Sequence, residues 1–390
     1  MWSDAMMKFY RRYPVVLARG EGVTVYDEEG RSYFDFLAGI GVSSLGHNHP
    51  RVRTAIEESM SLLHTSNWYW NRPAMSLAEK LSRIAEGMEV FFCNSGTEAN
   101  EAGLKLLRRF GSERGRFHVI SMLGGFHGRT MGAMALTPTP QYRDPFRPLP
   151  DGFSAVAYND LAALESELQK TQAAGVVLEP IQGESGVVMA KPGYLRQVSE
   201  LCHAYDALFM VDAVQTGMGR TGTWFGFEHE SGVSPDVITL AKGLAAGVPV
   251  GAVLARPTVA DALRPGEHGT TFGGNPLATS VAMVVVAWLE QGGLDHVKRV
   301  GKVLEDQLEA IKSRHPESVG EVRGRGLMWG MVLNLANTRV VQRCLDRGLL
   351  VNAAGGNVLR LLPPLVVEQE DIIAAMAVLE QSLAEVEGEG

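Results

Sequence analysis

The chain has 390 residues, of which 45% are hydrophobic, 21% are charged and 44 are glycine, as expected for a globular protein with a large and a smaller domain. The net charge of −8 and the lack of Lys/Arg runs argue against a nucleic acid or an anionic membrane as partner. The three cysteines, Cys93, Cys202 and Cys344, are widely spaced, which suits a reducing cytoplasm. The N-terminus lacks a signal-peptide core, and the longest apolar run, "PLATSVAMVVVAWLE", is too short and mixed to span a bilayer. We therefore expect a soluble cytoplasmic protein.

The first predicted element is a β-hairpin in "GVTVYDEEGRSYFDF", where apolar and polar residues alternate around a Gly-containing turn. From about Glu89, short apolar runs recur and are separated by helical stretches such as "NDLAALESELQK". The runs are "EVFFCN", "FHVISM", "AGVVLEP", "LFMVDAV", "DVITLAK" and "PVGAVLA". This alternation predicts an α/β domain with a mainly parallel sheet covered on both faces.

After about Pro276 the pattern changes to a long helix, several strand-like runs and a final amphipathic helix that opens at "EQEDIIAAM". We interpret this part as a smaller α+β domain that the N-terminal hairpin completes. The predicted division is residues 1–45 for the N-terminal segment of the small domain, 46–280 for the large domain and 281–390 for the C-terminal small domain.

Three features at the carboxyl ends of predicted strands bear on chemistry, because ligands bind at this edge of such sheets. Gly96 and Thr97 begin a helix behind Ser95, and a helix N-terminus suits a phosphate. Asp212 ends one buried strand and Lys242 ends another. A desolvated lysine is a nucleophilic amine. Each feature alone also fits a plain capped helix, a paired carboxylate or a surface lysine.

Together these features match what pyridoxal 5′-phosphate needs from a protein. Its aldehyde takes a lysine as a Schiff base, its phosphate takes a helix N-terminus, and its ring nitrogen stays protonated beside a carboxylate. Lys242, Gly96 with Thr97, and Asp212 would supply these groups in turn. No metal site is predicted: His47 and His49 are two residues apart in "GHNHP", but no third ligand accompanies them.

Seven motifs in a fixed order carry a resemblance to a known family. They are "NSGTEANEAGLKLLRR", "GGFHGRTMGAMALT", "LEPIQGESGV", "VDAVQTGMGRTG", "ITLAKGLAAGVPVGA", "HGTTFGGNPLA" and "NVLRLLPPL". The chain resembles the class III, fold type I, pyridoxal-phosphate aminotransferases from "GHNHP" to the last helix, and most of all their acetylornithine/ornithine aminotransferase branch. The fold implied is a large domain with a mainly parallel, seven-stranded type of sheet plus a smaller α+β domain.

The resemblance implies a role for each matching residue around the cofactor. Lys242 would bind the aldehyde and carry the proton between the substrate Cα and the cofactor C4′, and Asp212 would hold the ring nitrogen protonated. The other implied contacts are Val214 and Phe126 on the two ring faces, Gln215 at the phenolic oxygen, and Gly96 and Thr97 at the phosphate. In the family, which forms homodimers with shared sites, Thr271 would reach the partner's phosphate, with Thr270 near the substrate.

Two arginines and a glutamate are implied to select the substrates. Planar arginines bind carboxylates bidentately. Arg129 resembles the arginine for the α-carboxylate of acetylornithine and the distal carboxylate of glutamate. Arg360 resembles the arginine for glutamate's α-carboxylate, and Glu184 the acid that masks it while an ω-amine binds. Spacing alone favours a structural ion pair for Arg360 and a solvated loop charge for Glu184.

Two residues within these motifs receive no catalytic role. Lys242 already supplies proton transfer, so we interpret His127 as structural. Ala213 is a departure, because the family usually has Glu after the aspartate; the ring-nitrogen contact belongs to Asp212 and should survive.

The sequence therefore predicts an aminotransferase that moves the ω-amino group of N2-acetylornithine to 2-oxoglutarate, as in arginine biosynthesis. Other donors stay open: ornithine, succinylornithine, succinyl-diaminopimelate, 4-aminobutyrate or carrier-bound aminoadipate semialdehyde. A non-catalytic relative would have lost Lys242 or Asp212, and a racemase or decarboxylase would not need two carboxylate-binding arginines.

Overall fold

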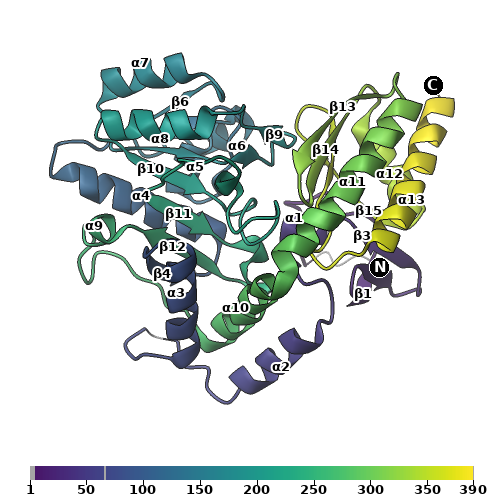
Figure 1. Ribbon diagram of the computed structural model, residues 1–390, viewed down its shortest axis with the longest axis horizontal. Helices are drawn as coiled ribbons and strands as arrows, with labels where there is room; N and C mark the ends of the chain where they lie inside the picture. The colour runs from purple at the N-terminus through teal and green to yellow at the C-terminus, as the bar shows by residue number, and fades with distance from the viewer. Residues whose placement is uncertain (1–4, 66, 390) are drawn as a thin grey trace.

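The computed structural model describes residues 5–65 and 67–389. Its large sheet has seven strands in the order β4-β12-β11-β10-β7-β5-β6, with helices on both faces (Figure 1). The strands are β4 (Glu89–Cys93), β5 (Val119–Met122), β6 (Phe153–Val156), β7 (Gly175–Leu178), β10 (Leu208–Asp212), β11 (Val237–Leu240) and β12 (Gly251–Ala255). The predicted α/β class is confirmed.

One strand breaks the parallel arrangement of this sheet. β12 runs antiparallel to both of its neighbours, β11 and β4, whereas β10 runs parallel to β11 and to β7. The six apolar runs of the sequence all form strands here. The seventh, β6, lies at the sheet edge and is mostly half-buried, so "FSAV" lacks the continuous apolar character of the others.

The helices of the large sheet pack on both of its faces. Helix α4 (Gly96–Ser112) contacts β4, β7, β10, β11 and β12, and α8 (Tyr194–Ala204) packs against β10 and against α7 (Leu161–Thr171). The remaining short or peripheral elements of this part are α1 (Ala38–Gly41), α2 (Pro50–Ser59), α3 (Arg72–Ile84), α5 (Met131–Leu136), α6 (Pro140–Arg143), α9 (Pro257–Ala260), β8 (Ile181–Gln182) and β9 (Val188–Met189).

Two four-stranded sheets lie outside the large one. The first joins the predicted N-terminal hairpin, β2 (Thr24–Asp27) and β3 (Ser32–Asp35), to β1 (Leu17–Glu21) and to β15 (Leu349–Leu350). The second contains β13 (Val319–Arg325), β14 (Met328–Leu333), β17 (Val358–Leu361) and β16 (Asn352–Ala354). The pairing of β3 with β15 brings an N-terminal strand beside the C-terminal part (Figure 1). The boundaries at 45/46 and 280/281 stay predictions.

A long helical stretch connects the two parts of the molecule. It consists of α10 (Pro276–Trp288), a π-helical turn (Leu289–Gly293) and α11 (Leu294–Arg314). By length and composition alone, Pro276–Arg314 could cross a membrane, which the shorter apolar run in the sequence did not indicate. However, α10 packs against α2 and α3, and Val281, Ala282 and Val285 are fully buried. Its apolar side chains therefore fill the core of the protein.

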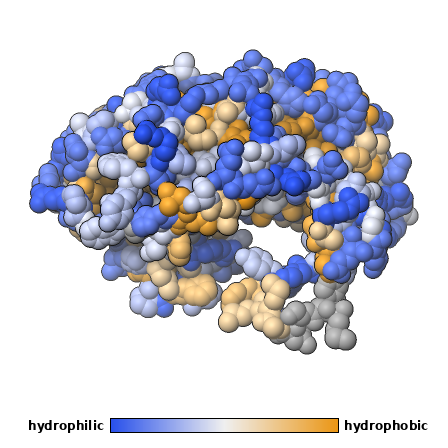
Figure 2. All heavy atoms as spheres, turned by 90° about the horizontal axis from the view of Figure 1, so that it is seen from below, coloured by the Kyte–Doolittle hydropathy of each residue, from blue (hydrophilic) through white to orange (hydrophobic). Residues whose placement is uncertain are grey.

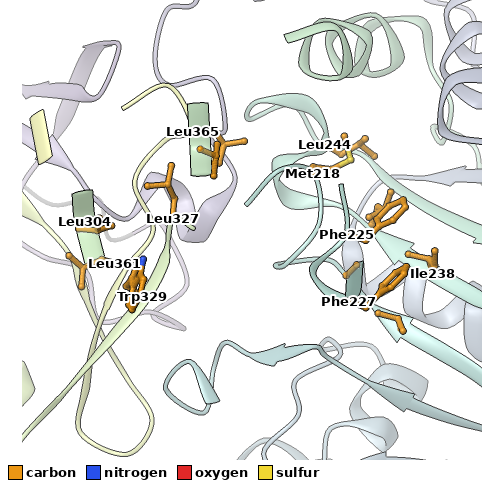
Figure 3. Packing of buried hydrophobic residues seen from close by; sticks show 14 of the residues in the cluster. Met218, Phe225, Phe227, Ile238, Leu244, Leu304, Leu327, Trp329, Leu361 and Leu365 are labelled. Carbon is orange, nitrogen blue, oxygen red and sulfur yellow. The ribbon is translucent and has the colours of Figure 1, made fainter. Parts of the chain in front are cut away.

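The main core cluster extends through both parts of the chain. Figure 3 shows Met218, Phe225 and Ile238 on one side, and Leu327 and Trp329 on the other, all buried. The C-terminal helices α12 (Asn337–Asp346) and α13 (Gln369–Gly388) pack against each other beside the small sheets (Figure 1). The two parts thus share one apolar cluster, which fixes where the small sheets sit relative to the large one.

Candidate active site

A cavity of about 380 Å³ opens where β10 and β11 end and α4 begins. This is the edge at which parallel sheets bind ligands. Nine of the predicted site residues line it: Gly96, Thr97, Phe126, Arg129, Glu184, Asp212, Val214, Gln215 and Lys242. The other three, Thr270, Thr271 and Arg360, do not belong to its lining.

Asp212 is the last residue of β10 and is 3% exposed. Its Oδ2 accepts hydrogen bonds from Nδ2 of Asn100 at 2.7 Å and lies 2.8 Å from Nδ1 of His127. Its Oδ1 accepts the backbone N–H of Val214 at 3.0 Å. Asn100 is itself fixed, because its Oδ1 accepts the hydroxyl of Thr239 at 2.8 Å. The buried carboxylate is therefore held in one orientation.

His127 lines the cavity and contacts Asp212; its interpretation as a structural residue without an acid–base role stays a prediction. Burial favours its neutral form, but the hydrogen bond and negative charge of Asp212, with a further contribution from Glu179, raise the pKa of His127 above its ordinary value. Its Nε2 is buried and has no hydrogen-bond partner among the described residues. The imidazolium form thus pairs directly with the Asp212 carboxylate.

Lys242 follows β11 in the 3-10 turn Lys242–Ala245 and has a φ of 40°. This left-handed conformation is uncommon for a residue other than glycine and is a feature of functional sites. Burial lowers the pKa of Lys242 and Arg360 lowers it further, against the opposing charges of Glu184, Glu179 and Asp212. Within the described residues its amine has no hydrogen-bond or ion-pair partner, so the amine is available to a ligand.

The N-terminus of α4 meets the cavity at Gly96 and Thr97. Ser95 caps the helix, because its side chain accepts the N–H of Glu98 at 3.3 Å. The Glu98 carboxylate in turn accepts the backbone N–H of Asn94 at 2.7 Å, one residue before the N–H that a capping box would use. Helix α4 is 17 residues long, and its free N–H groups favour an anion in the cavity.

Two aromatic rings surround the guanidinium of Arg129. Its Cζ lies 3.8 Å from the ring centroid of Tyr142 and 5.3 Å from that of Phe126. The two rings contact each other edge to face, with centroids 6.0 Å apart. In the part of the chain that the structure describes, no carboxylate pairs with this guanidinium. Arg129 is thus a cation at the cavity that is free to bind an anion.

Arg360 lies behind the cavity lining in β17 and is fully buried. Its Nη1 donates to Oε1 of Glu184 at 2.7 Å and to Oε1 of Gln215 at 3.3 Å, and its Nε donates to Oδ1 of Asn352 at 3.2 Å. Although burial alone would raise it, the pKa of Glu184 is lowered overall by the charge and hydrogen bond of Arg360. The two residues form a charged pair at the cavity wall, as predicted for their positions.

The two threonines of "HGTTFGG" lie apart from the other predicted residues within this one chain. Thr270 accepts a hydrogen bond from Nδ2 of Asn94 at 3.2 Å, which brings it to the edge of the cavity. Thr271 is exposed and does not line the cavity. Its contact with the phosphate of a partner's site stays a prediction.

Asn100 and Glu179 are site residues that the sequence interpretation missed. Glu179 is 5% exposed, and its Oε1 accepts the N–H of Phe126 at 2.9 Å. Burial and the charge of Asp212 raise the pKa of Glu179 to about 7. Both residues could have been noticed in the sequence, because a polar residue among apolar ones needs a partner when it is buried. Asn100 lies on the buried face of α4, and Glu179 directly follows β7.

Ala213, the departure from the family pattern, is 1% exposed and belongs to the main apolar cluster. Its N–H donates to the carbonyl of Thr239 at 3.0 Å, and its carbonyl accepts the N–H of Gly217 at 2.8 Å. A small apolar side chain therefore fits this position, and the backbone on both sides is held without a second carboxylate.

Comparison with known proteins agrees with this geometry. The model of the family described as aminotransferase class-III matches residues 6–383. The chain is 45% identical to the acetylornithine aminotransferase of Methanocaldococcus jannaschii, covering 99% of this chain and 98% of the relative. Its fold is similar to that of an ornithine aminotransferase from Toxoplasma gondii (TM-score 0.94, 35% identity, 99% and 94% coverage). It is also similar to an N-acetylornithine aminotransferase from Stenotrophomonas maltophilia (TM-score 0.85, 38% identity, 98% of both chains). The chain belongs to the class-III aminotransferases.

Proposed function

We propose that this protein is a pyridoxal-phosphate-dependent acetylornithine aminotransferase, which moves the ω-amino group of N2-acetylornithine to 2-oxoglutarate and yields N-acetylglutamate semialdehyde and glutamate. The observation that carries the proposal is the composition of one cavity. Its lining contains a lysine amine that has no partner among the described residues, a buried and oriented aspartate, a helix N-terminus, and a carboxylate that is paired with a buried arginine.

The cavity suits pyridoxal phosphate on three counts. Gly96 lets the helix N-terminus lie close against Val214 at the cavity wall, since a Cβ there would lie only 2.8 Å from Cγ1 of Val214. Lys242 has an amine with a lowered pKa and no partner within the described chain. Asp212 keeps an acceptor oxygen in a fixed orientation. These residues match the phosphate, the aldehyde and the ring nitrogen of the cofactor.

Each residue then has a defined task in the transfer. The cofactor, when bound, supplies an electron sink for the substrate carbon that carries the nitrogen. Asp212 holds a proton at the ring nitrogen and thereby keeps that sink effective. Lys242 moves the proton between the substrate carbon and the cofactor carbon, for which a lowered pKa is suitable because the neutral amine is the base. Phe126 and Val214 confine the ring between them.

The two arginines give a physical reason for the use of two substrates. Arg129 has no carboxylate partner in the described chain and binds a carboxylate of either substrate. Arg360 is neutralised by Glu184 at 2.7 Å, so an ω-amine donor meets no free cation there. When glutamate or 2-oxoglutarate binds, its α-carboxylate replaces Glu184 on Arg360. An acylated donor carries no free α-ammonium and needs no acid for one.

A half-reaction experiment tests the donor. The cofactor-loaded protein is mixed with N2-acetylornithine alone, and the absorbance of the bound cofactor is followed in time. We expect conversion with acetylornithine and slower conversion with ornithine. Ornithine is the second candidate, because the Toxoplasma gondii structure at TM-score 0.94 is an ornithine aminotransferase. Conversion by ornithine with no change on addition of acetylornithine would reverse the order of the two candidates.

The lysine assignment has its own test. Lys242→Ala should abolish turnover while the protein folds and still binds the cofactor noncovalently. A Lys242→Ala variant with the activity of the unmodified protein would exclude the assigned role of Lys242. Repeated turnover without 2-oxoglutarate, beyond one product per bound cofactor, would instead favour a racemase or decarboxylase.

A homodimer in the cytoplasm is part of the same proposal. Thr271 is exposed and outside the cavity of its own chain, as a residue given to a partner's site must be. Trp68, Trp70 and Phe272 are 87%, 90% and 62% exposed, and such apolar side chains favour a protein partner. Apolar patches also interrupt the hydrophilic surface seen from below (Figure 2). All three cysteines are buried and unpaired, in keeping with a reducing compartment. Sedimentation measurements should give a dimer.

A further inference from the structure

We propose that Tyr142 is a positioning residue that sets the carboxylate-binding geometry of Arg129 through the face of its ring. The inference rests on the proposed function, in which Arg129 binds a carboxylate of each substrate. It concerns a residue outside the seven sequence motifs, on the short helix α6 that follows α5 in the chain.

The first step of the argument is the contact itself. The Cζ of Arg129 lies 3.8 Å from the Tyr142 ring centroid, which is close for a cation and an aromatic face. Phe126 lies farther from the guanidinium, at 5.3 Å, and meets Tyr142 edge to face with an interplanar angle of 88°. Tyr142 is therefore the nearer ring, and Phe126 supports it from the side.

The second step concerns the N–H donors of Arg129, which stay unused when the guanidinium contacts the face of a ring. A guanidinium has five N–H donors, all in its plane, and a ring below that plane uses none of them. Elsewhere in the site, the guanidinium of Arg360 is held through Nη1, which donates to Glu184 and Gln215, and through Nε, which donates to Asn352. In the described chain the Arg129 side chain has no such partner. The ring thus orients Arg129 while its whole hydrogen-bonding edge stays available for a carboxylate.

The third step concerns the cost of binding. Arg129 is exposed, and an exposed arginine side chain loses rotamer freedom when it binds. A guanidinium already held on a ring loses less, so Tyr142 should contribute to substrate affinity more than to the chemical step. The effect should apply equally to acetylornithine and to 2-oxoglutarate, because Arg129 binds both.

The central experiment measures steady-state kinetics of Tyr142→Leu and Tyr142→Phe. We expect Tyr142→Leu to raise the KM for both substrates by about three- to thirtyfold with a much smaller change in kcat. Tyr142→Phe keeps the ring face and should restore the low KM values. Should Tyr142→Leu fail to fold, Tyr142→Met removes the ring while it keeps an apolar side chain, and the same expectation holds.

Two controls separate positioning from a general structural effect. n-Butylamine has no carboxylate, so its single-turnover rate with the cofactor-loaded protein should be the same in Tyr142→Leu and in the unmodified protein. The matched control variant is Tyr26→Leu, which removes the ring of another arginine–tyrosine pair, Arg19 with Tyr26 at 3.5 Å; neither residue of this pair lines the cavity. Tyr26→Leu should leave both KM values unchanged.

A double-mutant cycle with Arg129→Gln completes the test. If Tyr142 acts through Arg129, Tyr142→Leu should have little further effect on KM in the Arg129→Gln protein. Unchanged KM values in Tyr142→Leu, or an equal loss of the n-butylamine reaction, would overturn the inference about Tyr142 while the proposed function stands. Unchanged KM values in Arg129→Gln would instead remove the carboxylate role of Arg129, and with it both the substrate part of the proposed function and this inference.

Discussion

The carboxylate of Asp212 lies 2.8 Å from Nδ1 of His127, and both side chains are buried at the end of β10. This pair connects the strand that carries the aspartate to the loop that carries Phe126 and Arg129. The pKa of His127 is raised, and its protonated form donates to Asp212 from Nδ1, which fixes the orientation of the aspartate side chain. Through this contact, His127 supports the aspartate that we propose for the ring nitrogen of the cofactor.

The first prediction concerns this contact. His127→Leu removes a hydrogen bond to a buried charge, which contributes roughly 1.5–3 kcal/mol, so kcat should fall about ten- to a hundredfold. His127→Asn can still donate from its amide nitrogen and should retain more activity than His127→Leu. Steady-state kinetics at saturating substrates measure both. Equal activity of the two variants would mean that the hydrogen bond to Asp212 does not support catalysis.

The second prediction concerns the pH dependence of stability. The pKa of Glu179 is raised to about 7 by burial, followed by the charge of Asp212, so between about pH 4.5 and 7 the folded protein retains a proton that the unfolded chain releases. The free energy of unfolding should therefore fall as the pH rises through this window, by on the order of 3 kcal/mol at most. Glu179→Gln cannot release a proton and should lack this fall.

Urea unfolding of the cofactor-free protein at several pH values measures this difference. The free energy of unfolding of Glu179→Gln minus that of the unmodified protein should rise from pH 4.5 to 7 and then stay constant. His127 also has a raised pKa, so it stabilises the fold below about pH 6.5 and loses that effect as the pH rises further. This second fall should be present in both proteins. A constant difference between them at all pH values would exclude titration of Glu179.

The sequence was sufficient for the fold class and for the nine predicted residues that line the cavity. Asp212 and Lys242 could be assigned to the site because each follows an apolar run, and the carboxyl ends of parallel strands lie at one edge of the sheet. His127, Asn100 and Glu179 were not assigned to the site. Asn100 contacts Asp212 across 112 positions of sequence, and only the packing of α4 on β10 brings the two together. Strand β6 was missed because an edge strand is only partly buried and has little apolar signal.

The third prediction concerns the phosphate end of the cavity. Gly96→Ala would bring a Cβ to 2.8 Å and 3.0 Å from the two methyl groups of Val214, so the helix N-terminus or Val214 must shift. We expect cofactor affinity to fall at least about tenfold. Val214→Ala removes both methyl groups, so Gly96→Ala should weaken cofactor binding less in a Val214→Ala protein than in the unmodified protein. Fluorescence titration of the four cofactor-free proteins measures this, and an equal loss in both backgrounds would show that the contact is not the cause.

The fourth prediction concerns how Glu184 controls Arg360. In the structure Oε1 of Glu184 accepts from Nη1 of Arg360 at 2.7 Å, so the α-carboxylate of glutamate must break a charge-assisted hydrogen bond to reach this arginine. Glu184→Gln keeps the shape of the side chain and removes its charge. The α-carboxylate of glutamate then no longer has to displace a charged carboxylate from Arg360, so the reaction with glutamate should be favoured. Acetylornithine instead meets an Arg360 whose charge is no longer neutralised, so its reaction should be disfavoured.

Single-turnover measurements with each amine alone give the two values of kcat/KM. The ratio of acetylornithine to glutamate should fall about tenfold or more in Glu184→Gln, because a hydrogen bond to a charged group contributes roughly 1.5–3 kcal/mol. The cofactor affinity should change less than this ratio, since the hydrogen bond of Glu184 at 2.7 Å joins it to Arg360 and not to the helix N-terminus or Asp212. Arg360→Lys provides the complementary variant: it keeps the charge but loses the planar fork, so glutamate should react more slowly while acetylornithine does not. A ratio unchanged by Glu184→Gln would mean that Glu184 holds Arg360 in place without selecting between the two substrates.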